Sequence, residues 1–72
     1  MRARINIDTL HKINEFVNIC SQLDCEVNLI DGEGYCISGK SLLGAIATTD
    51  WSEVFVECEK DIYSLIEDFI VE

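Results

Sequence analysis

The side chains of this chain that could do chemistry gather at two expected helix starts. One holds Thr9 and the single histidine, His11, and the other holds Ser41 directly after Lys40. Asp8 and Thr9 offer oxygens that can cap the first helix, and the Ser41 hydroxyl can accept a hydrogen bond from a backbone N–H two or three residues further on. The free N–H groups and dipole of a helix start also favour an anion such as phosphate. Capping and anion chemistry are therefore the competing interpretations of both places.

The four cysteines form no recognisable metal or redox motif. They lie at Cys20, Cys25, Cys36 and Cys58, without a C-x-x-C spacing and with one histidine to accompany them. Cys20 falls on an apolar helical stripe and Cys58 continues an alternating strand, where a small hydrophobic residue fits. We predict buried thiols, no metal site and no cofactor.

Length and charge limit the class of protein. With 72 residues the chain is expected to form one domain, residues 1–72, whose core is only just large enough. Fourteen acidic residues against five basic ones give a net charge of −9, which disfavours nucleic acid and anionic membranes as partners. No apolar run approaches the roughly 20 residues of a membrane span, and the first residues do not resemble a signal peptide. We therefore expect a cytoplasmic protein.

The negative charge is concentrated towards the end of the chain. Eight acidic residues and one base, Lys60, follow Thr49. This pattern predicts either a solvated outer surface or a surface that attracts an electropositive partner.

The first half of the chain predicts a strand, a helix and a hairpin. Residues 1–7 alternate apolar and polar side chains, as a half-buried strand does, and residues 10–23 carry apolar side chains at spacings of three and four. Residues 24–30 and 35–38 then predict two strands. The intervening turn, residues 31–34, contains an Asp-Gly step that favours an antiparallel hairpin.

The second half predicts helix, strand and helix. Ser41 opens a helix of about two turns, which must pack on a sheet because it is too short to be stable alone. Residues 53–58 alternate as a fourth strand, and residues 62–70 have the clearest helical spacing of the chain. This order suits an α+β domain with helices on one face of an antiparallel sheet.

The segment at residues 39–44 resembles a known family. It reads G-K-S-L-L-G and is similar to the serine-site segment of HPr, the phosphocarrier protein of the bacterial sugar phosphotransferase system, where the family pattern is K-S-[IL]-[LM]-G. The expected strands and helices also follow the family's order over nearly all of the chain. The resemblance implies an open-faced sandwich with sheet order 1-4-2-3 and three helices on one face.

The same resemblance places Thr9 at the family's phosphohistidine position. His11 and Lys12 then stand where the family has an arginine and a proline. Three interpretations remain: Thr9 only caps the helix, His11 carries the phosphate instead, or the helix start holds an anion without transferring it. A shift of two positions turns a helical side chain by roughly 200°, which disfavours His11 as a substitute.

At Ser41 the resemblance implies a regulatory site. The matching serine is phosphorylated by a dedicated kinase in part of the family, although a plain N-cap also explains Ser41. The residues beside it form an exposed patch that docks partner proteins in the family, so we expect the partner-binding residues to be Lys40, Leu42, Leu43 and Ile46. From the sequence, the three apolar side chains could equally belong to the core.

The resulting hypothesis is an HPr-like protein without phosphohistidine carrier activity, which binds or regulates through the Ser41 region. Its expected partner is a phosphotransferase-system enzyme or regulator, and the chain itself is at most a phosphocarrier rather than an enzyme. Two alternatives stay open: an active phosphocarrier that uses His11, and an unrelated acidic adaptor with the same element order.

Overall fold

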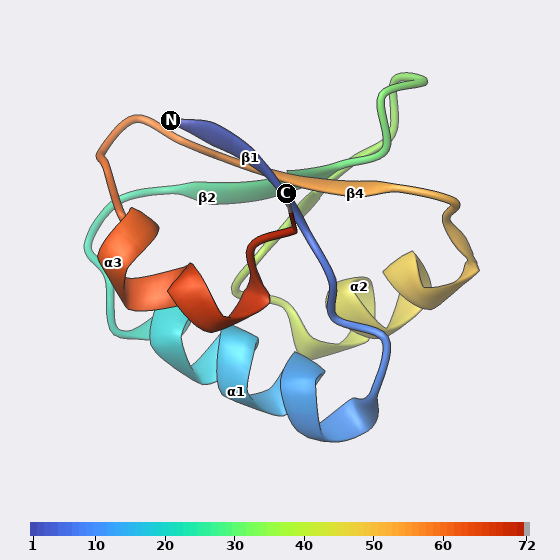
Figure 1. The fold of residues 1–72 in the computed structure, drawn as a ribbon, viewed down its shortest axis with the longest axis horizontal. Helices are drawn as coiled ribbons and strands as arrows, with labels where there is room; N and C mark the ends of the chain where they lie inside the picture. Colours follow the sequence, from blue (N-terminus) through green and yellow to red (C-terminus); the bar gives the residue numbers. More distant parts are fainter. Residues whose placement is uncertain (72) are drawn as a thin grey trace.

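Alternating apolar residues form four strands, and apolar stripes form three helices that all cover one face of the resulting sheet (Figure 1). The computed structural model describes residues 1–71. The strands are β1 (Arg2–Ile5), β2 (Val27–Ile30), β3 (Cys36–Ser38) and β4 (Val54–Cys58). The helices are α1 (Leu10–Ser21), α2 (Leu42–Ala47) and α3 (Tyr63–Ile66), and the short 3₁₀ helices Thr48–Asp50 and Glu67–Phe69 extend the last two. The predicted α+β class is confirmed.

The strands pair antiparallel in the order β1-β4-β2-β3. Val56 lies opposite both Ala3 and Leu29, and Leu29 lies opposite Ile37. Opposed residues of antiparallel strands point to the same face, so these four side chains form a row beneath the helices. The order 1-4-2-3, which the strand patterns left open and the resemblance implied, is confirmed.

Helix α1 provides the largest contribution of the helices to the core. Its buried side chains are Ile13, Phe16, Val17 and Cys20. The ring of Phe16 meets the ring of Phe69 edge-on, with centroids 5.5 Å apart and an interplanar angle of 86°. This contact fastens the end of the chain to α1. Leu10, which the apolar spacing assigned to the same stripe, is exposed at the first position of the helix.

The predicted hairpin joins β2 and β3, with a loop that is one residue longer than expected. The carboxylate of Asp31 accepts hydrogen bonds from the backbone N–H of Glu33 at 2.7 Å and of Tyr35 at 3.1 Å. Gly32 and Gly34 have φ values of 86° and 114°, which only glycine adopts readily. Because Asp31 holds the N–H of Tyr35 inside the loop, β3 begins at Cys36 and not at residue 35.

The prediction that the final helix extends over residues 62–70 is wrong at the end of the helix. Helix α3 has four residues, and Ile70 is extended and forms an antiparallel bridge with Ile5 of β1. The Asn6 N–H donates to the carbonyl of Phe69 at 2.8 Å, and the Val71 N–H donates to the carbonyl of Arg4 at 2.9 Å. Periodicity did not reveal that the edge of β1 offers hydrogen bonds to this segment.

Other predicted boundaries were too wide. Strand β1 covers Arg2–Ile5 within the expected 1–7, β2 starts at Val27 instead of residue 24, and α1 ends at Ser21 instead of residue 23. At the end of α1 the Leu23 N–H donates to the carbonyl of Cys20, which closes the last turn. The apolar side chain of Leu23 therefore belongs to the turn that follows the helix.

The prediction of buried thiols holds for three of the four cysteines. Cys20, Cys25 and Cys58 are buried, whereas Cys36 is exposed. Cys36 begins β3 and its neighbour Ile37 packs against the core, so Cys36 points to the opposite, open face of the sheet.

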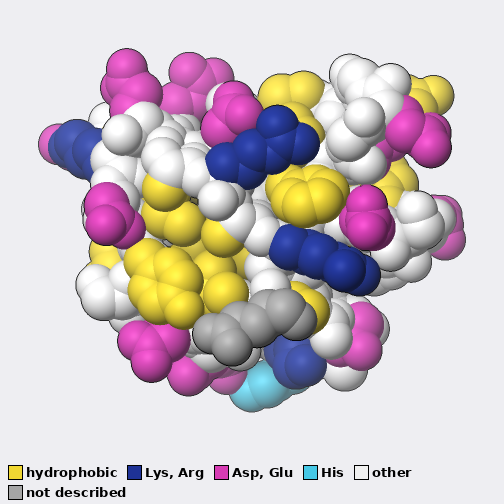
Figure 2. All heavy atoms as spheres, turned by 45° about the horizontal axis from the view of Figure 1, so that its top comes forward, with side chains coloured by type: hydrophobic (Ala, Val, Ile, Leu, Met, Phe, Trp, Pro, Cys, Tyr) yellow, Lys and Arg dark blue, Asp and Glu magenta, His cyan; other side chains and the backbone are white. Residues whose placement is uncertain are grey.

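The open face of the sheet mixes basic and hydrophobic side chains (Figure 2). The guanidinium of Arg2 lies over the ring of Phe55, 5.1 Å from its centroid, and Arg4 reaches Glu53 at 3.8 Å. Both contacts join side chains of β1 to side chains of β4 or of the residue directly before it. Within residues 1–71, no helix combines the length and the apolar character needed to cross a membrane.

Candidate functional site

The start of α1 is capped by Thr9. This residue has extended backbone angles, φ −120° and ψ 154°, and its Oγ1 accepts a hydrogen bond from the backbone N–H of Lys12 at 3.2 Å. The ammonium of Lys12 in turn lies 3.4 Å from the carboxylate of Asp8. The side chains of Asp8 and Thr9, which precede the first turn, thus both contact Lys12 within that turn.

His11 lies in the first turn of α1, and its side chain contacts a residue of the second turn. Its Nε2 is 2.6 Å from a carboxylate oxygen of Glu15, one turn further along α1, and its side chain is 82% exposed. The imidazole thus contacts the side chain one turn further along α1, whereas Thr9 caps the N–H of Lys12.

The start of α2 is capped by Ser41 in the same way. The Ser41 Oγ accepts a hydrogen bond from the Gly44 N–H at 3.1 Å, and its carbonyl accepts from the Ala45 N–H at 2.9 Å. Ser41 itself is exposed. The predicted N-cap role is confirmed, and the hydroxyl remains within reach of another molecule.

The apolar side chains of α2 lie on the surface, which answers the question that the sequence left open. Leu43 is 81% exposed, Leu42 is 42% exposed and Ile46 is 38% exposed, whereas Ala45 is fully buried. We call Leu42, Leu43 and Ile46 the α2 patch.

Small residues on the inner side of α2 explain this orientation. A Cβ at Gly44 would lie 3.2 Å from Cδ1 of Ile37 in β3, so Gly44 allows the helix to approach the sheet closely. With Gly44 and Ala45 facing inwards, the helix turns its large side chains outwards.

Lys40 does not lie free beside the α2 patch. It is half-buried, and its ammonium donates to the carbonyl of Leu23 at 2.7 Å, just beyond the end of α1. A cation stabilises the unpaired carbonyls at a helix end. Of the four expected partner-binding residues, Lys40 thus links α2 to α1, and the other three form the exposed surface.

The two helix starts belong to one end of the molecule. Helices α1 and α2 pack against each other, and in Figure 1 the beginning of α1 and the whole of α2 lie on the side opposite α3. This side therefore carries Thr9, His11, Ser41 and the α2 patch.

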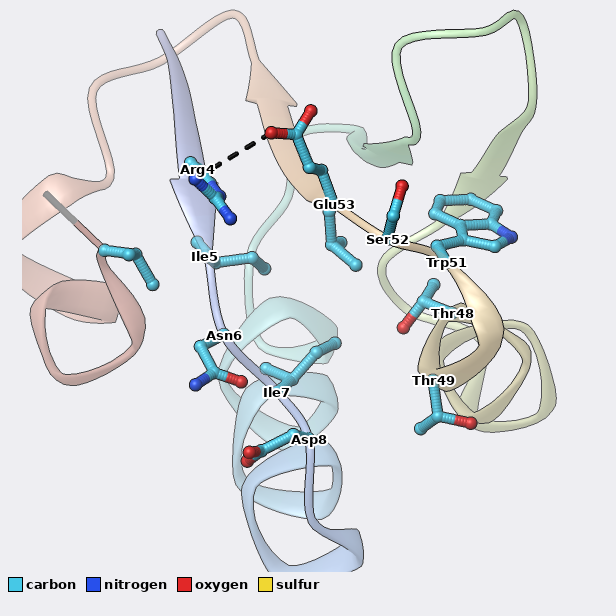
Figure 3. A pocket seen from close by; sticks show the side chains of 12 residues that line it. Arg4, Ile5, Asn6, Ile7, Asp8, Thr48, Thr49, Trp51, Ser52 and Glu53 are labelled. Carbon is cyan, nitrogen blue, oxygen red and sulfur yellow. Dashed lines mark ion pairs between the residues drawn. The ribbon is translucent and has the colours of Figure 1, made fainter.

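A polar hollow of about 260 Å³ lies between the end of β1 and the segment that enters β4 (Figure 3). Arg4 and Glu53 are joined across it, and Asn6, Asp8 and Ser52 contribute further polar groups. Sequence reasoning missed this hollow, because its residues come from three separate segments, residues 4–8, residues 48–54 and Val71, which share no motif.

A second hollow, of about 310 Å³, lies between the β2–β3 loop and residues 50–52, which follow α2. Its lining combines three acidic residues with two aromatic rings, namely Asp31, Glu33, Asp50, Tyr35 and Trp51. The two rings stack with centroids 6.4 Å apart. Of the eight acidic residues that follow residue 49 in the sequence, only Asp50 lines this hollow, and the other two carboxylates come from the β2–β3 loop.

No protein-family model, curated protein or solved structure matches this chain. Within residues 1–71, no group of three or more His, Cys, Asp or Glu side chains is arranged to hold a metal ion.

Proposed function

We propose that this chain is an HPr-like protein of the phosphotransferase-system type that binds a partner protein through the α2 patch and does not carry phosphate on a histidine. The observation that carries the proposal is the exposure of Leu43, at 81%, two residues after the capping Ser41. The strand order 1-4-2-3, which the HPr resemblance implied, supports it further. The acidic-adaptor alternative keeps the same element order but gives no reason for this strand order.

The α2 patch has the properties of a docking surface. Burying apolar surface contributes about 25 cal/mol per Å², so three adjoining aliphatic side chains can supply much of the binding free energy of a small interface. The acidic hollow is lined by Asp31 and Glu33 of the hairpin loop and by Asp50 of the 3₁₀ helix that directly follows α2. We therefore expect a partner with an apolar centre and basic side chains at its rim.

The start of α1 supports the loss of carrier chemistry. Thr9 has a hydroxyl where the family has an imidazole, and this hydroxyl caps the helix. The alternative carrier, His11, is well exposed, but its Nε2 is held by Glu15 and it follows Thr9 by two positions. A phosphate on His11 would lack the N–H groups of the helix start.

Ser41 is the proposed regulatory site. Its exposed hydroxyl accepts one backbone hydrogen bond, and a phosphate there would stay close to the first turn of α2. A group with nearly two negative charges beside Leu42 and Leu43 would change how a partner fits the patch. Phosphorylation by a serine kinase would thus act on the docking surface directly.

An NMR titration tests the proposal. The ¹⁵N-labelled protein is mixed with the purified general enzyme of the phosphotransferase system, with and without phosphoenolpyruvate. We expect shifted amide signals in residues 42–47 and no acid-labile phosphate. Unchanged signals in these residues would contradict docking through α2, and an acid-labile phosphate on His11 would instead establish the phosphocarrier alternative.

A further inference from the structure

Two buried thiols lie in contact although their residues are far apart in the chain. The Sγ atoms of Cys25 and Cys58 are 3.4 Å apart, across 33 sequence positions. The pairing of β2 with β4 produces this contact, because Val27 lies opposite Cys58 and Cys25 precedes Val27 by two residues. Neither thiol belongs to the docking surface described above.

An ion pair joins the chain segments that carry the two thiols, and Cys58 is held from its other side by the start of the chain. The ammonium of Lys60 lies 2.9 Å from the carboxylate of Asp24, so the neighbours of the thiols form an ion pair between the same segments. Cys58 also exchanges backbone hydrogen bonds with Met1. The thiols are therefore held next to each other before any bond forms between them, which raises their effective concentration.

We propose that Cys25 and Cys58 are a dithiol site that is oxidised to an intramolecular disulfide by a low-molecular-weight disulfide such as oxidised glutathione. In the first step the Cys25 thiolate attacks one sulfur of the oxidant; a mixed disulfide forms and one small thiolate leaves and takes up a proton. The Cys58 thiol then loses its proton, and its sulfur attacks Sγ of Cys25 and expels the second small thiol. One protein dithiol and one disulfide thus give one protein disulfide and two thiols.

The position of Cys25 makes it the first thiol of the pair to react. It is 8% exposed, whereas Cys58 is 4% exposed and Cys20 is fully buried. Burial, with a smaller effect of Cys58, raises the pKa of Cys20 to about 12, so this third thiol is a poor nucleophile. Cys36 is exposed, but it lies on the open face of the sheet and has no thiol beside it among residues 1–71.

The reaction is expected to be slow at neutral pH and faster in alkaline solution. The hydrogen bond with Cys58 and burial raise the pKa of the Cys25 thiol, while the nearby charge of Lys60 acts in the opposite direction. Because the thiolate is the attacking species, a raised pKa lowers its fraction near neutrality. The rate therefore increases with pH across the alkaline range.

The disulfide would close a loop that contains β2, β3, α2 and β4. Cross-linking residues 33 positions apart restricts the unfolded chain, and for a domain of this size the expected rise in Tm is roughly 10 °C or more. The α2 patch lies inside this loop but far from the bond in sequence. Oxidation is thus expected to change stability while leaving docking through α2 intact.

The experiment uses the full chain and oxidised glutathione. After incubation at several pH values, intact mass, proteolytic mapping of the bond and Tm are measured for the wild type and for Cys25→Ser, Cys58→Ser, Cys20→Ala and Cys36→Ser. We expect Cys36→Ser to lose two hydrogen atoms, and the wild type, Cys20→Ala and Cys36→Ser each to give a cross-linked peptide containing Cys25 and Cys58 and to melt at a higher temperature than its own reduced form.

The contradicting results are equally specific. A mixed disulfide at Cys36 as the sole product, a bond that includes Cys20, or no cross-link even in alkaline solution would overturn the proposal. Bond mapping in the wild type and in Cys36→Ser decides the matter even where Cys25→Ser or Cys58→Ser fails to fold, because Cys36 is exposed and its replacement leaves the core unchanged.

Discussion

Thr9 and Ser41 each accept a hydrogen bond from the backbone N–H three residues further along the chain. Their hydroxyls satisfy donors that a helix start would otherwise leave unpaired. In the proposed HPr-like assignment, Thr9 corresponds to the family's phosphohistidine and Ser41 to its regulatory serine. At the residue scale, the proposed function depends on two capping residues. Thr9 has a hydroxyl in place of a phosphate-carrying imidazole, and Ser41 has a hydroxyl that a kinase could phosphorylate.

Substitutions of Thr9 measure how much its capping hydrogen bond contributes to the free energy of unfolding. Thr9→Ala removes the acceptor for the Lys12 N–H and should lower the free energy of unfolding by about 1 kcal/mol. Thr9→Ser keeps the acceptor and should melt close to the wild type. Thermal denaturation of the two variants side by side checks this. Equal stability of Thr9→Ala and Thr9→Ser would show that the hydrogen bond contributes little.

Restoring a phosphocarrier should need two changes. Thr9→His alone supplies an imidazole but leaves His11 where the family has an arginine that binds the phosphate. We expect no phosphate transfer from the general enzyme to Thr9→His, and measurable transfer only after His11→Arg is added. Transfer assays with phosphoenolpyruvate read this directly. Full activity of the single variant would mean that the arginine matters less than the resemblance implies.

The Asp24–Lys60 ion pair predicts a pH window of stability. The hydrogen bond from Lys60, and then its charge, lower the pKa of Asp24 below its ordinary 3.8, and the same contact raises the pKa of Lys60 above its ordinary 10.5. The contribution of the pair is therefore present at neutral pH, is lost as the pH falls through the lowered pKa of Asp24, and is also lost as the pH rises through the raised pKa of Lys60.

Asp24→Asn tests this window. At about pH 7 the variant should melt slightly below the wild type, and at about pH 2 the two should coincide. Both groups are exposed, so the difference at neutral pH should be small and should shrink in high salt. A difference that persists in strong acid would point to a role of Asp24 other than the ion pair.

At the element scale, α2 is the helix whose orientation matters most. Its small residues face β3 and its large ones face solvent, as the exposed Leu43 and the buried Ala45 show. A short helix with this arrangement buries little of its own apolar surface. We propose that its exposed apolar side chains serve a contact outside the molecule.

Two glutamate substitutions in α2 test this orientation. Leu43→Glu should change the free energy of unfolding by no more than about 0.5 kcal/mol, because the side chain is exposed. Ala45→Glu puts a charge into the core and should unfold a domain of this size. Circular dichroism melts compare the two. Unfolding by Leu43→Glu would show that the leucine is part of the core and would remove the docking patch.

The sequence predicted elements well where local rules decide them. The caps at Thr9 and Ser41, the Asp31-Gly32 turn and the apolar stripe of α1 all follow from neighbouring residues. The prediction from the sequence was wrong where a segment distant in the chain offers hydrogen bonds that end a local element. Residues 62–70 have helical spacing, but residues 67–69 tighten into a 3₁₀ helix, and Ile70 is extended and bridges to Ile5, because β1 has an open edge nearby.

At the scale of the whole molecule, non-local pairing creates most of what the sequence did not reveal. The hollow at Arg4 and Glu53 and the contact of Cys25 with Cys58 both join residues more than 30 positions apart. Strand order was available only through the resemblance at residues 39–44, since alternation shows which residues face the core but not which strands are neighbours. The exposure of the α2 patch likewise required the folded chain.

The central claim is that one end of the helical layer binds a partner through the α2 patch. Leu65 of α3 provides a matched control, because it is 52% exposed and α3 lies at the opposite side of the layer in Figure 1. Leu43→Glu and Leu65→Glu add the same charge at exposed leucines. The two variants therefore share their effects on net charge and differ in which surface they change.

Calorimetric titration of the wild type, Leu43→Glu and Leu65→Glu with the general phosphotransferase enzyme is the most direct test. We predict that Leu43→Glu binds at least about tenfold more weakly than the wild type, which corresponds to a loss of roughly 1.4 kcal/mol, and that Leu65→Glu binds as the wild type does. Equal affinity of Leu43→Glu and the wild type, or an equal loss in both variants, would contradict docking through α2.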